Sequence, residues 1–245
     1  MAIKLKALGA TLMWALFLAN LIIASLAVGW ELLAAQGFGY RPAYRLLQID
    51  RTIDQYGPLN QRRPGFQLTS FDERQRLFDA IVRAIHHRGE GLDQLVYRAG
   101  DGRVIGRLLT PAEVIHLQDV ARLVSILRPV GWGAIALLLV GSIQLRRKSV
   151  SLPGKKLVIA GALLGCGGLG LIAVVGAETI FYQLHRWVFP PGHQWFFYYE
   201  ESLMSMMMQA PNLFGVVAMF WALLAGLVMV AWYLVVGRKL RREEI

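Results

Sequence analysis

Two histidines, His116 and His185, are the side chains best placed for chemistry, because each lies a few helical turns from an apolar run. Glu113 and Asp119 flank His116 at spacings of three, so these side chains share one face of a helix. An imidazole whose tautomer is fixed by a carboxylate acts as a general base in acyl-transfer sites. The pattern therefore predicts a histidine-dependent site.

The second histidine has neighbours of its own, because Tyr182 and Glu178 precede His185 by three and seven residues and share its helix face. Either histidine alone is more typical of an interfacial residue that snorkels or caps a helix. Acyl-transfer chemistry requires both imidazoles in one site. Whether the helices that carry them bring them together therefore decides between a catalytic pair and two interfacial histidines.

The composition is that of a membrane protein: of 245 residues, 56% are hydrophobic and 17% are charged. Crossing about 30 Å of hydrocarbon takes about 20 helical residues. Four apolar runs are long enough, at about residues 8–30, 122–145, 157–177 and 212–237. The first run follows two lysines, as a signal peptide does, but its uncharged length favours an uncleaved anchor. We therefore expect an all-α membrane protein with four transmembrane helices.

Basic residues in short segments mark the cytoplasmic side of a membrane protein. Here they precede the first span, separate the second from the third, and follow the fourth. Both termini are therefore expected inside, with residues 31–121 and 178–211 outside. These two outer segments should form a largely helical region packed on the membrane surface, within a single membrane domain of residues 1–245. The net charge of +10 comes largely from the cytoplasmic ends, which favours anionic lipid over nucleic acid as a partner.

Capping boxes predict two helices in the first outer segment. Ser70 and Glu73 begin one that ends near His87, and Thr110 and Glu113, with proline at the first helical position, begin another. Between them, residues 97–109 contain a glycine-rich turn flanked by short apolar runs, which predicts a small hairpin.

The helices place the two candidate histidines at similar heights. Counting about 20 residues back from Leu145 puts the outer membrane boundary near Ile126. At about 1.5 Å per residue, His116 lies about 15 Å beyond that boundary and His185 about 12 Å beyond Ala177. Close packing of these helices would bring both imidazoles into one site that faces outward.

The other histidines and soft ligands show no metal-site spacing. His86 and His87 point in different directions on a helix, and together with His193 they form no ligand pattern. His193 near the methionines of residues 204–208 could suggest copper, but such a run favours apolar contact with lipid chains. The aromatic residues of 195–199 indicate a belt at the headgroup level. We predict no metal, disulfide or cofactor.

Two segments resemble motifs of a known family. Glu113, His116, Asp119 and Val120, in that spacing, resemble the outer-loop motif of the bacterial lipoprotein intramolecular transacylase (Lit) family of four-span integral membrane proteins. The segment 184–189, followed by Trp195, Pro211 and Phe214, resembles the motif that precedes the last span of that family.

The resemblance implies an acyltransferase that moves the sn-2 acyl chain of a diacylglyceryl-cysteine lipoprotein to the α-amino group of the same cysteine. The product would be a lyso-form lipoprotein, made at the outer side of a bacterial cytoplasmic membrane without a cofactor. Diacylated lipoproteins and membrane lipids would be its partners.

The same interpretation assigns roles to named residues. His116 and His185 would be catalytic, and which of them is the base stays open. The supporting residues would be Glu113 and Asp119 beside His116, and Tyr182 and Glu178 beside His185. The residues lining the lipid approach would be Trp195, Phe189, Met204 and Met208.

Two other functions stay open at this point. A non-enzymatic membrane assembly or sensory protein could bind a partner through its outer loops, and it would need neither histidine. Soft-metal transport would require liganding residues inside the spans, where the sequence has almost none.

Overall fold

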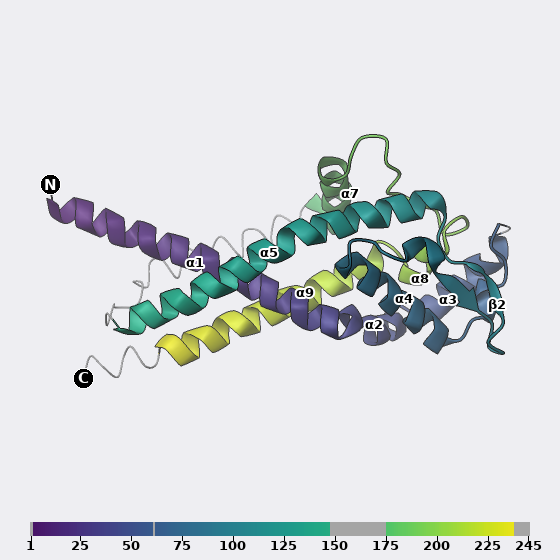
Figure 1. The fold of residues 1–245 in the computed structure, drawn as a ribbon, viewed down its shortest axis with the longest axis horizontal. Coiled ribbons are helices and arrows are strands. Elements are labelled where there is room, and N and C mark those ends of the chain that lie inside the picture. The colour runs from purple at the N-terminus through teal and green to yellow at the C-terminus, as the bar shows by residue number, and fades with distance from the viewer. Residues whose placement is uncertain (1, 61, 148–174, 238–245) are drawn as a thin grey trace. The chain divides into compact units, whose positions relative to one another are not determined.

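The computed structural model describes residues 2–60, 62–147 and 175–237 (Figure 1). The helices are α1 (Ala2–Ala35), α2 (Tyr40–Leu46), α3 (Ile49–Tyr56), α4 (Phe71–His86), α5 (Pro111–Arg147), α7 (Ala177–Val188), α8 (Leu203–Met208) and α9 (Asn212–Trp232). Short helical turns are η1 (Gly37–Gly39), η2 (Gly57–Leu59), η3 (Phe66–Leu68), η4 (Leu92–Gln94) and the π-helical η5 (Tyr233–Gly237). The strands are β1 (Val96–Arg98) and β2 (Val104–Arg107).

Within the described residues, three helical segments are long and apolar enough to cross a membrane: Thr11–Ala35, Pro111–Leu145 and Asn212–Val235. They contain or overlap the predicted spans at 8–30, 122–145 and 212–237. The predicted span at 157–177 falls almost entirely outside the described residues. The α5 segment is longer than one crossing requires. Its charges, Glu113, Asp119, Arg122 and Arg128, lie in its N-terminal half, so the part that can cross lies toward its C-terminal end.

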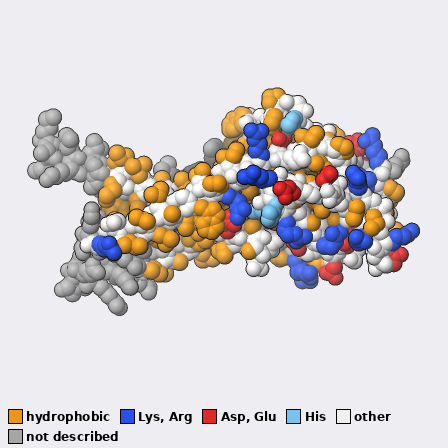
Figure 2. All heavy atoms as spheres, viewed as in Figure 1, with side chains coloured by type: hydrophobic (Ala, Val, Ile, Leu, Met, Phe, Trp, Pro, Cys, Tyr) orange, Lys and Arg blue, Asp and Glu red, His pale blue; other side chains and the backbone are white. Residues whose placement is uncertain are grey.

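The chain divides into two compact units. Unit 1 comprises residues 1–32, 128–176 and 221–245, and unit 2 comprises residues 33–127 and 177–220. In unit 1, α1 and α5 pack through Leu21, Ala24, Ala134 and Leu138, all buried. Other apolar side chains of these helices point outward, and Figure 2 shows hydrophobic side chains covering this part of the molecule. An apolar exterior is the expected surface of a helix bundle in lipid.

Polar side chains in unit 1 are paired across its helices. Arg128 donates two hydrogen bonds to the Glu31 carboxylate, at 2.8 and 3.1 Å. The Trp221 indole donates to the Leu26 carbonyl at 2.7 Å, and the Trp232 indole donates to the Ser142 hydroxyl at 2.8 Å. Each pairing satisfies a donor that would be costly to leave unpaired in an apolar environment.

The close approach of α1 and α5 depends on Gly131. A Cβ atom added at Gly131 would lie 2.7 Å from the Ala27 Cβ, whereas one added at Gly133 would meet nothing within 4 Å. We expect Gly131→Ala to lower the free energy of unfolding by about 1–3 kcal/mol, because overpacking pushes the helices apart. Gly133→Ala is the matched control and should be neutral or stabilising. Denaturant unfolding in detergent measures both, and equal stabilities of the two variants would contradict the packing.

Unit 2 contains the helices that the caps predict. The Ser70 hydroxyl accepts a hydrogen bond from the Glu73 N–H at 3.1 Å and begins α4. The helix ends at His86, with His87 as its C-cap, as expected. Leu77 and Ile81 form the buried face of α4. The predicted helix is therefore confirmed.

The predicted hairpin is confirmed as well. Strands β1 and β2 pair antiparallel, with Tyr97 opposite Gly106 and a bulge between Tyr97 and Arg98. Tyr97 is buried, and its hydroxyl donates to the Pro64 carbonyl at 2.9 Å. Since Arg63 precedes Pro64 in the chain, the hairpin helps to fix a loop that the site below requires.

Helix α8 belongs to the core of unit 2. All six of its residues are buried, and it packs against α3. The buried Tyr40 hydroxyl donates to the Met207 carbonyl at 2.9 Å, and Gln209 donates to the Thr52 hydroxyl at 2.6 Å. Tyr40 also stacks on Phe78 of α4, at 4.2 Å between ring centroids. Residues far apart in the sequence thus hold α8 in a fixed place.

Candidate active site

The N-terminus of α5 is fixed by a complete capping box. The Glu113 N–H donates to the Thr110 hydroxyl at 3.3 Å, and the Thr110 N–H donates to the Glu113 carboxylate at 2.5 Å. Two of the unpaired N–H groups at this helix end are therefore satisfied. One turn later, the helix presents His116, a residue that is only 9% exposed.

Helix α7 supplies the second histidine in a defined tautomer. Nδ1 of His185 lies 2.8 Å from the Phe181 carbonyl oxygen, one turn earlier. Because a carbonyl only accepts, Nδ1 must carry the proton, and in the neutral ring Nε2 then holds a lone pair. His185 is therefore prepared to accept a proton at Nε2.

The two imidazoles lie together, as the sequence predicts. Their ring centroids are 6.1 Å apart and their planes are inclined by 30°. Aromatic rings surround them: Phe189 lies 4.8 Å from His116 and 5.1 Å from His185, and Trp195 lies 5.0 Å from His185. The pair thus lies within a cluster of aromatic rings in unit 2.

This environment keeps both imidazoles neutral. Burial lowers the pKa of His116 to about 4, with a smaller lowering from the nearby His185 and an opposing contribution from Asp119. Burial also lowers the pKa of His185, although its hydrogen bond to Phe181 opposes the shift. At neutral pH both rings are available as proton acceptors, and neither is a resting cation.

Burial of His116 predicts acid-sensitive stability. Between its ordinary pKa of 6.5 and its folded pKa of about 4, the unfolded chain binds a proton that the folded chain does not. The free energy of unfolding should therefore decrease as the pH falls through this range, by about 3 kcal/mol in total. His116→Phe should remove most of this decrease, as measured by thermal unfolding in detergent. His87→Phe, at an exposed position, should keep the wild-type slope, and an unchanged slope in His116→Phe would contradict the burial of a neutral imidazole.

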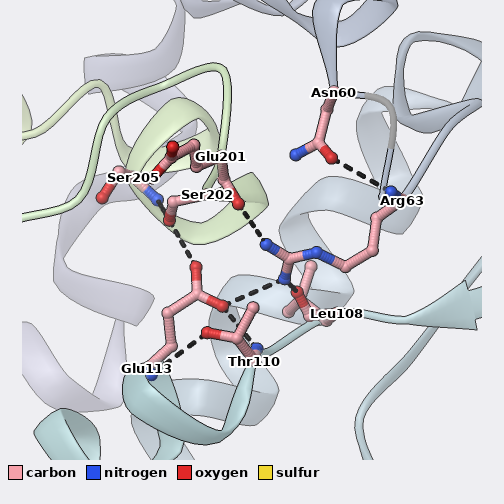
Figure 3. A network of polar contacts seen from close by, with 8 residues as sticks. All are labelled: Asn60, Arg63, Leu108, Thr110, Glu113, Glu201, Ser202 and Ser205. Carbon is pink, nitrogen blue, oxygen red and sulfur yellow. Dashed lines mark hydrogen bonds and ion pairs between the residues drawn. The ribbon is translucent and has the colours of Figure 1, made fainter.

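The structure corrects the predicted role of Glu113, which does not orient His116. Its carboxylate is fully buried and forms an ion pair with Arg63 at 3.0 Å (Figure 3). The Ser202 hydroxyl donates to the other carboxylate oxygen. The spacing of three predicts a shared helix face correctly, but a stronger partner from a distant loop takes the carboxylate.

The Glu113 network joins three distant segments. Arg63 also donates to the Leu108 carbonyl and the Glu201 carbonyl, each at 2.5 Å. Ser202 in turn accepts from the Ser205 N–H at 2.9 Å and caps α8. As Figure 3 shows, the guanidinium lies between the start of α5 and the segment that precedes α8. Glu113 therefore fixes the framework on which His116 is carried.

Asp119 also has a different partner from the one expected. Its carboxylate contacts Nδ1 of His193 at 2.6 Å, a histidine for which the sequence shows no role. Asp119 still raises the pKa of His116 through its charge, against the larger effect of burial. Its influence on His116 is electrostatic, and Nδ1 of His116 is buried without a hydrogen-bond partner among the described residues.

Tyr182 and Glu178 lie beside His185 on α7 without bonding to it. Desolvation raises the pKa of Tyr182, and its hydrogen bond to Glu178 raises it further. The ring of Tyr182 lies 5.7 Å from that of Trp195. The Phe181 carbonyl accepts the hydrogen bond from Nδ1 of His185, so the backbone fixes the tautomer of this histidine. Tyr182 instead packs against the neighbouring Trp195.

The residues expected to line the lipid approach divide into two pairs. Phe189 and Trp195 contact the imidazoles, as described above. Met204 and Met208 are each 5% exposed within α8, so their proposed place on an open lipid path is wrong. An apolar run next to aromatic residues is equally compatible with a buried helix, and α3 provides the covering surface.

The structure also brings in residues that the sequence interpretation missed. Arg63, Ser202 and His193 pair with the two carboxylates, and Phe197 lies 6.1 Å from His116. Arg63 is one of many arginines in a polar stretch, and Phe197 is one of several consecutive aromatic residues. No local pattern distinguishes them.

Comparison with known proteins gives a match in fold alone. No protein family profile matches the chain, and no curated protein matches its sequence. Three solved structures of the membrane integral lipoprotein intramolecular transacylase Lit from Bacillus cereus share its fold, and two of them carry a substitution of one histidine.

The structural match extends over the full length of both chains. One structure has a TM-score of 0.66 at 16% identity, over 95% of this chain and 96% of that one. The two histidine variants have TM-scores of 0.65 and 0.63 at 15% and 16% identity, covering 100% and 98% of this chain and 99% and 97% of theirs. The chain thus has the fold of a membrane-integral protein, in agreement with its apolar helices.

Proposed function

We propose that this protein is an intramolecular transacylase, which moves the sn-2 acyl chain of a diacylglyceryl-cysteine lipoprotein to the α-amino group of the same cysteine. The observation that carries the proposal is the pair of neutral imidazoles, 6.1 Å apart between ring centroids and surrounded by aromatic rings. The shared fold with Lit supports the same reaction class.

His185 is the proposed base, because its Nδ1–H is held by the Phe181 carbonyl and its Nε2 lone pair is free to take a proton. The amine nitrogen attacks the ester carbonyl carbon, and His185 takes a proton from the nitrogen. The bond between the acyl carbon and the glycerol oxygen then breaks, and the proton is returned to that oxygen. The products are an amide and a free hydroxyl on the same molecule, so no water or co-substrate is consumed.

His116 is proposed to assist at the departing oxygen. Its imidazole is neutral and buried, and its N–H can donate to developing negative charge in a site of low dielectric. A neutral donor suits this role, because a resting imidazolium would repel the protonated amine of the substrate.

Positioning supplies more of the rate than proton transfer in this mechanism. A well-placed base contributes about 10² to 10⁴ in rate. Holding an amine and an ester of one molecule at attack distance contributes about 7–11 kcal/mol. A compact site with two imidazoles and aromatic walls therefore suffices for the reaction.

We place the protein in a bacterial cytoplasmic membrane, with both termini inside and residues 31–121 and 178–211 outside. Basic residues at the predicted cytoplasmic ends support this orientation. Diacylated lipoproteins, which are anchored in the outer leaflet, are then the substrates, and membrane lipids are the surroundings.

The test is to express the full-length chain together with a diacylated lipoprotein in a bacterial host that lacks N-acylating enzymes. Mass spectrometry of the N-terminal lipopeptide should find an N-acyl, monoacylglyceryl cysteine. If the wild-type chain accumulates in the membrane and the lipopeptide keeps both ester-linked chains with a free amine, the proposal fails. A partner-binding protein without enzymatic activity would give that second result.

A further inference from the structure

The segment of residues 189–202, which we call the aromatic strap, covers the two imidazoles without forming a helix or strand. Its side chains alternate from residue 194 to residue 200. Trp195, Phe197 and Tyr199 are half-buried, whereas Phe196 and Tyr198 are exposed. This period of two is that of an extended chain with one face against the protein.

The inward face of the strap lies on the proposed site. Trp195 lies 5.0 Å from His185, and Phe197 lies 6.1 Å from His116, measured between ring centroids. His116 is 9% exposed under this cover. A bulky ester therefore reaches the buried imidazole only when the strap moves.

The end of the strap that leads into α8 is firmly attached. Ser202 donates to the buried Glu113, and the Glu201 carbonyl accepts from Arg63. Tyr199 donates to the Ala210 carbonyl at 2.7 Å. Since Glu113 and Ser202 are both buried, this end stays in place while the fold is intact.

Nearer its other end, the strap is joined to α5 by a partly exposed pair, in which the Asp119 side chain is 15% exposed. His193 contacts Asp119 at 2.6 Å, and the His193 side chain is 41% exposed. Within the part of the chain that the structure describes, the N–H groups of residues 194–200 donate no backbone–backbone hydrogen bond. A segment without backbone pairing, joined to α5 at this end by a partly exposed pair, opens at lower cost than a segment with backbone pairing.

Glu113, His116 and Asp119 therefore act together along one face of α5. Glu113 holds the fixed end of the strap, His116 lies under its middle, and Asp119 holds its releasable end. Side chains at successive spacings of three lie on one face of a helix, so both ends of the strap attach to the face of α5 that carries His116.

We propose that Asp119 and His193 are positioning residues that clasp the aromatic strap over the imidazoles, and that release of this clasp admits a lipid ester to His116. The identity of the ester rests on the function proposed above, but the clasp does not. Closed, the strap presses Trp195 and Phe197 onto the rings and excludes water. Open, it exposes the imidazoles from the side nearest His193.

The test bridges the clasp reversibly. In a Cys166→Ser background, Asp119→Cys and His193→Cys are joined by a short bis-methanethiosulfonate reagent that dithiothreitol removes. The matched control joins Arg41→Cys and Asp72→Cys, which replace another exposed ion pair of unit 2, 3.7 Å apart and away from the strap. Two readouts are taken on the full-length protein in detergent: the rate at which diethylpyrocarbonate modifies His116, and lipoprotein conversion.

We expect the bridged clasp to slow modification of His116 by at least about tenfold and to stop conversion, with both recovering on reduction, while the control bridge changes neither. In a second variant, His193→Ala, modification of His116 should become up to about fivefold faster, while thermal stability stays unchanged. A fivefold change corresponds to about 1 kcal/mol, the most that an exposed ion pair usually contributes. Unchanged modification rates in both the bridged protein and His193→Ala would overturn the clasp. If bridging slows modification but the wild type converts no lipoprotein, the clasp stands and the proposed reaction fails.

Discussion

Replacing His185 by Ala is expected to lower the rate of acyl transfer by about 10²- to 10⁴-fold, the contribution of a well-placed general base. The reason is local. Nδ1–H of His185 is held by the Phe181 carbonyl, which leaves Nε2 as the acceptor, and Ala removes that acceptor without disturbing a buried network. The measurement is the initial rate of lyso-form production, by mass spectrometry, from purified protein and a diacylated lipopeptide.

Residual activity after this change is part of the expectation. The aromatic walls still hold the amine and the ester of one substrate molecule together, and that contribution of about 7–11 kcal/mol does not depend on the base. His185→Ala should therefore lower kcat with a small change in KM. If the loss were instead confined to KM, His185 would be a binding residue and the proposed mechanism would be wrong.

The matched control is His87→Ala. His87 makes the same kind of contact as His185, with Nδ1 2.7 Å from the carbonyl of Arg83 one turn earlier, but it is exposed at the end of α4. The two histidines thus share local geometry and differ in their surroundings. His87→Ala should keep full activity, and an equal loss in both variants would point to a general effect on folding.

Local features of this fold were predictable because local physics decides them. Ser70 and Thr110 cap α4 and α5 through contacts with residues three positions away, so the sequence alone reveals them. The meeting of His116 and His185 was predictable from chain length, since each lies a countable number of helical turns from an apolar run. Three of the predicted spans follow from length and composition in the same way.

The partners of the carboxylates could not be predicted in this way. Glu113 pairs with Arg63, 50 residues earlier, and Asp119 pairs with His193, 74 residues later. Helical spacing shows that both carboxylates lie on the face of His116, but it does not show which distant segment lies on that face. His116, the imidazole on the same helix, was wrongly predicted as the partner of both carboxylates. Side chains three residues apart on a helix point outward side by side, so each contacts the segment that covers the helix and not its neighbour.

The methionines of α8 illustrate the same limit for apolar residues. A run of four methionines, interrupted by one serine, is compatible with a lipid-facing segment or with a buried helix. The deciding contacts come from α3 and Tyr40, more than 140 residues earlier in the chain. Hydrophobicity predicts that these residues avoid water, and only the tertiary structure shows what covers them.

Replacing Glu113 by Ala is expected to lower the free energy of unfolding by about 3–5 kcal/mol, the usual cost of removing one partner from a buried ion pair. Arg63 would keep its charge with only the Leu108 and Glu201 carbonyls as acceptors, and Ser202 would lose the acceptor for its hydroxyl. Chemical denaturation in detergent, followed by tryptophan fluorescence, measures the change. Lipoprotein conversion should fall as well, because the fixed end of the aromatic strap is released.

The double variant Glu113→Leu with Arg63→Met separates charge from structure. A buried ion pair replaced on both sides by apolar residues of similar volume is often close to neutral in stability, whereas either single change leaves an uncompensated charge or an unpaired group. The double variant should therefore be more stable than Glu113→Leu alone by at least about 1 kcal/mol. If the losses in free energy of unfolding of the two single variants simply add up in the double variant, the two side chains contribute independently. The Glu113–Arg63 ion pair would then not stabilise the attachment of the aromatic strap to α5.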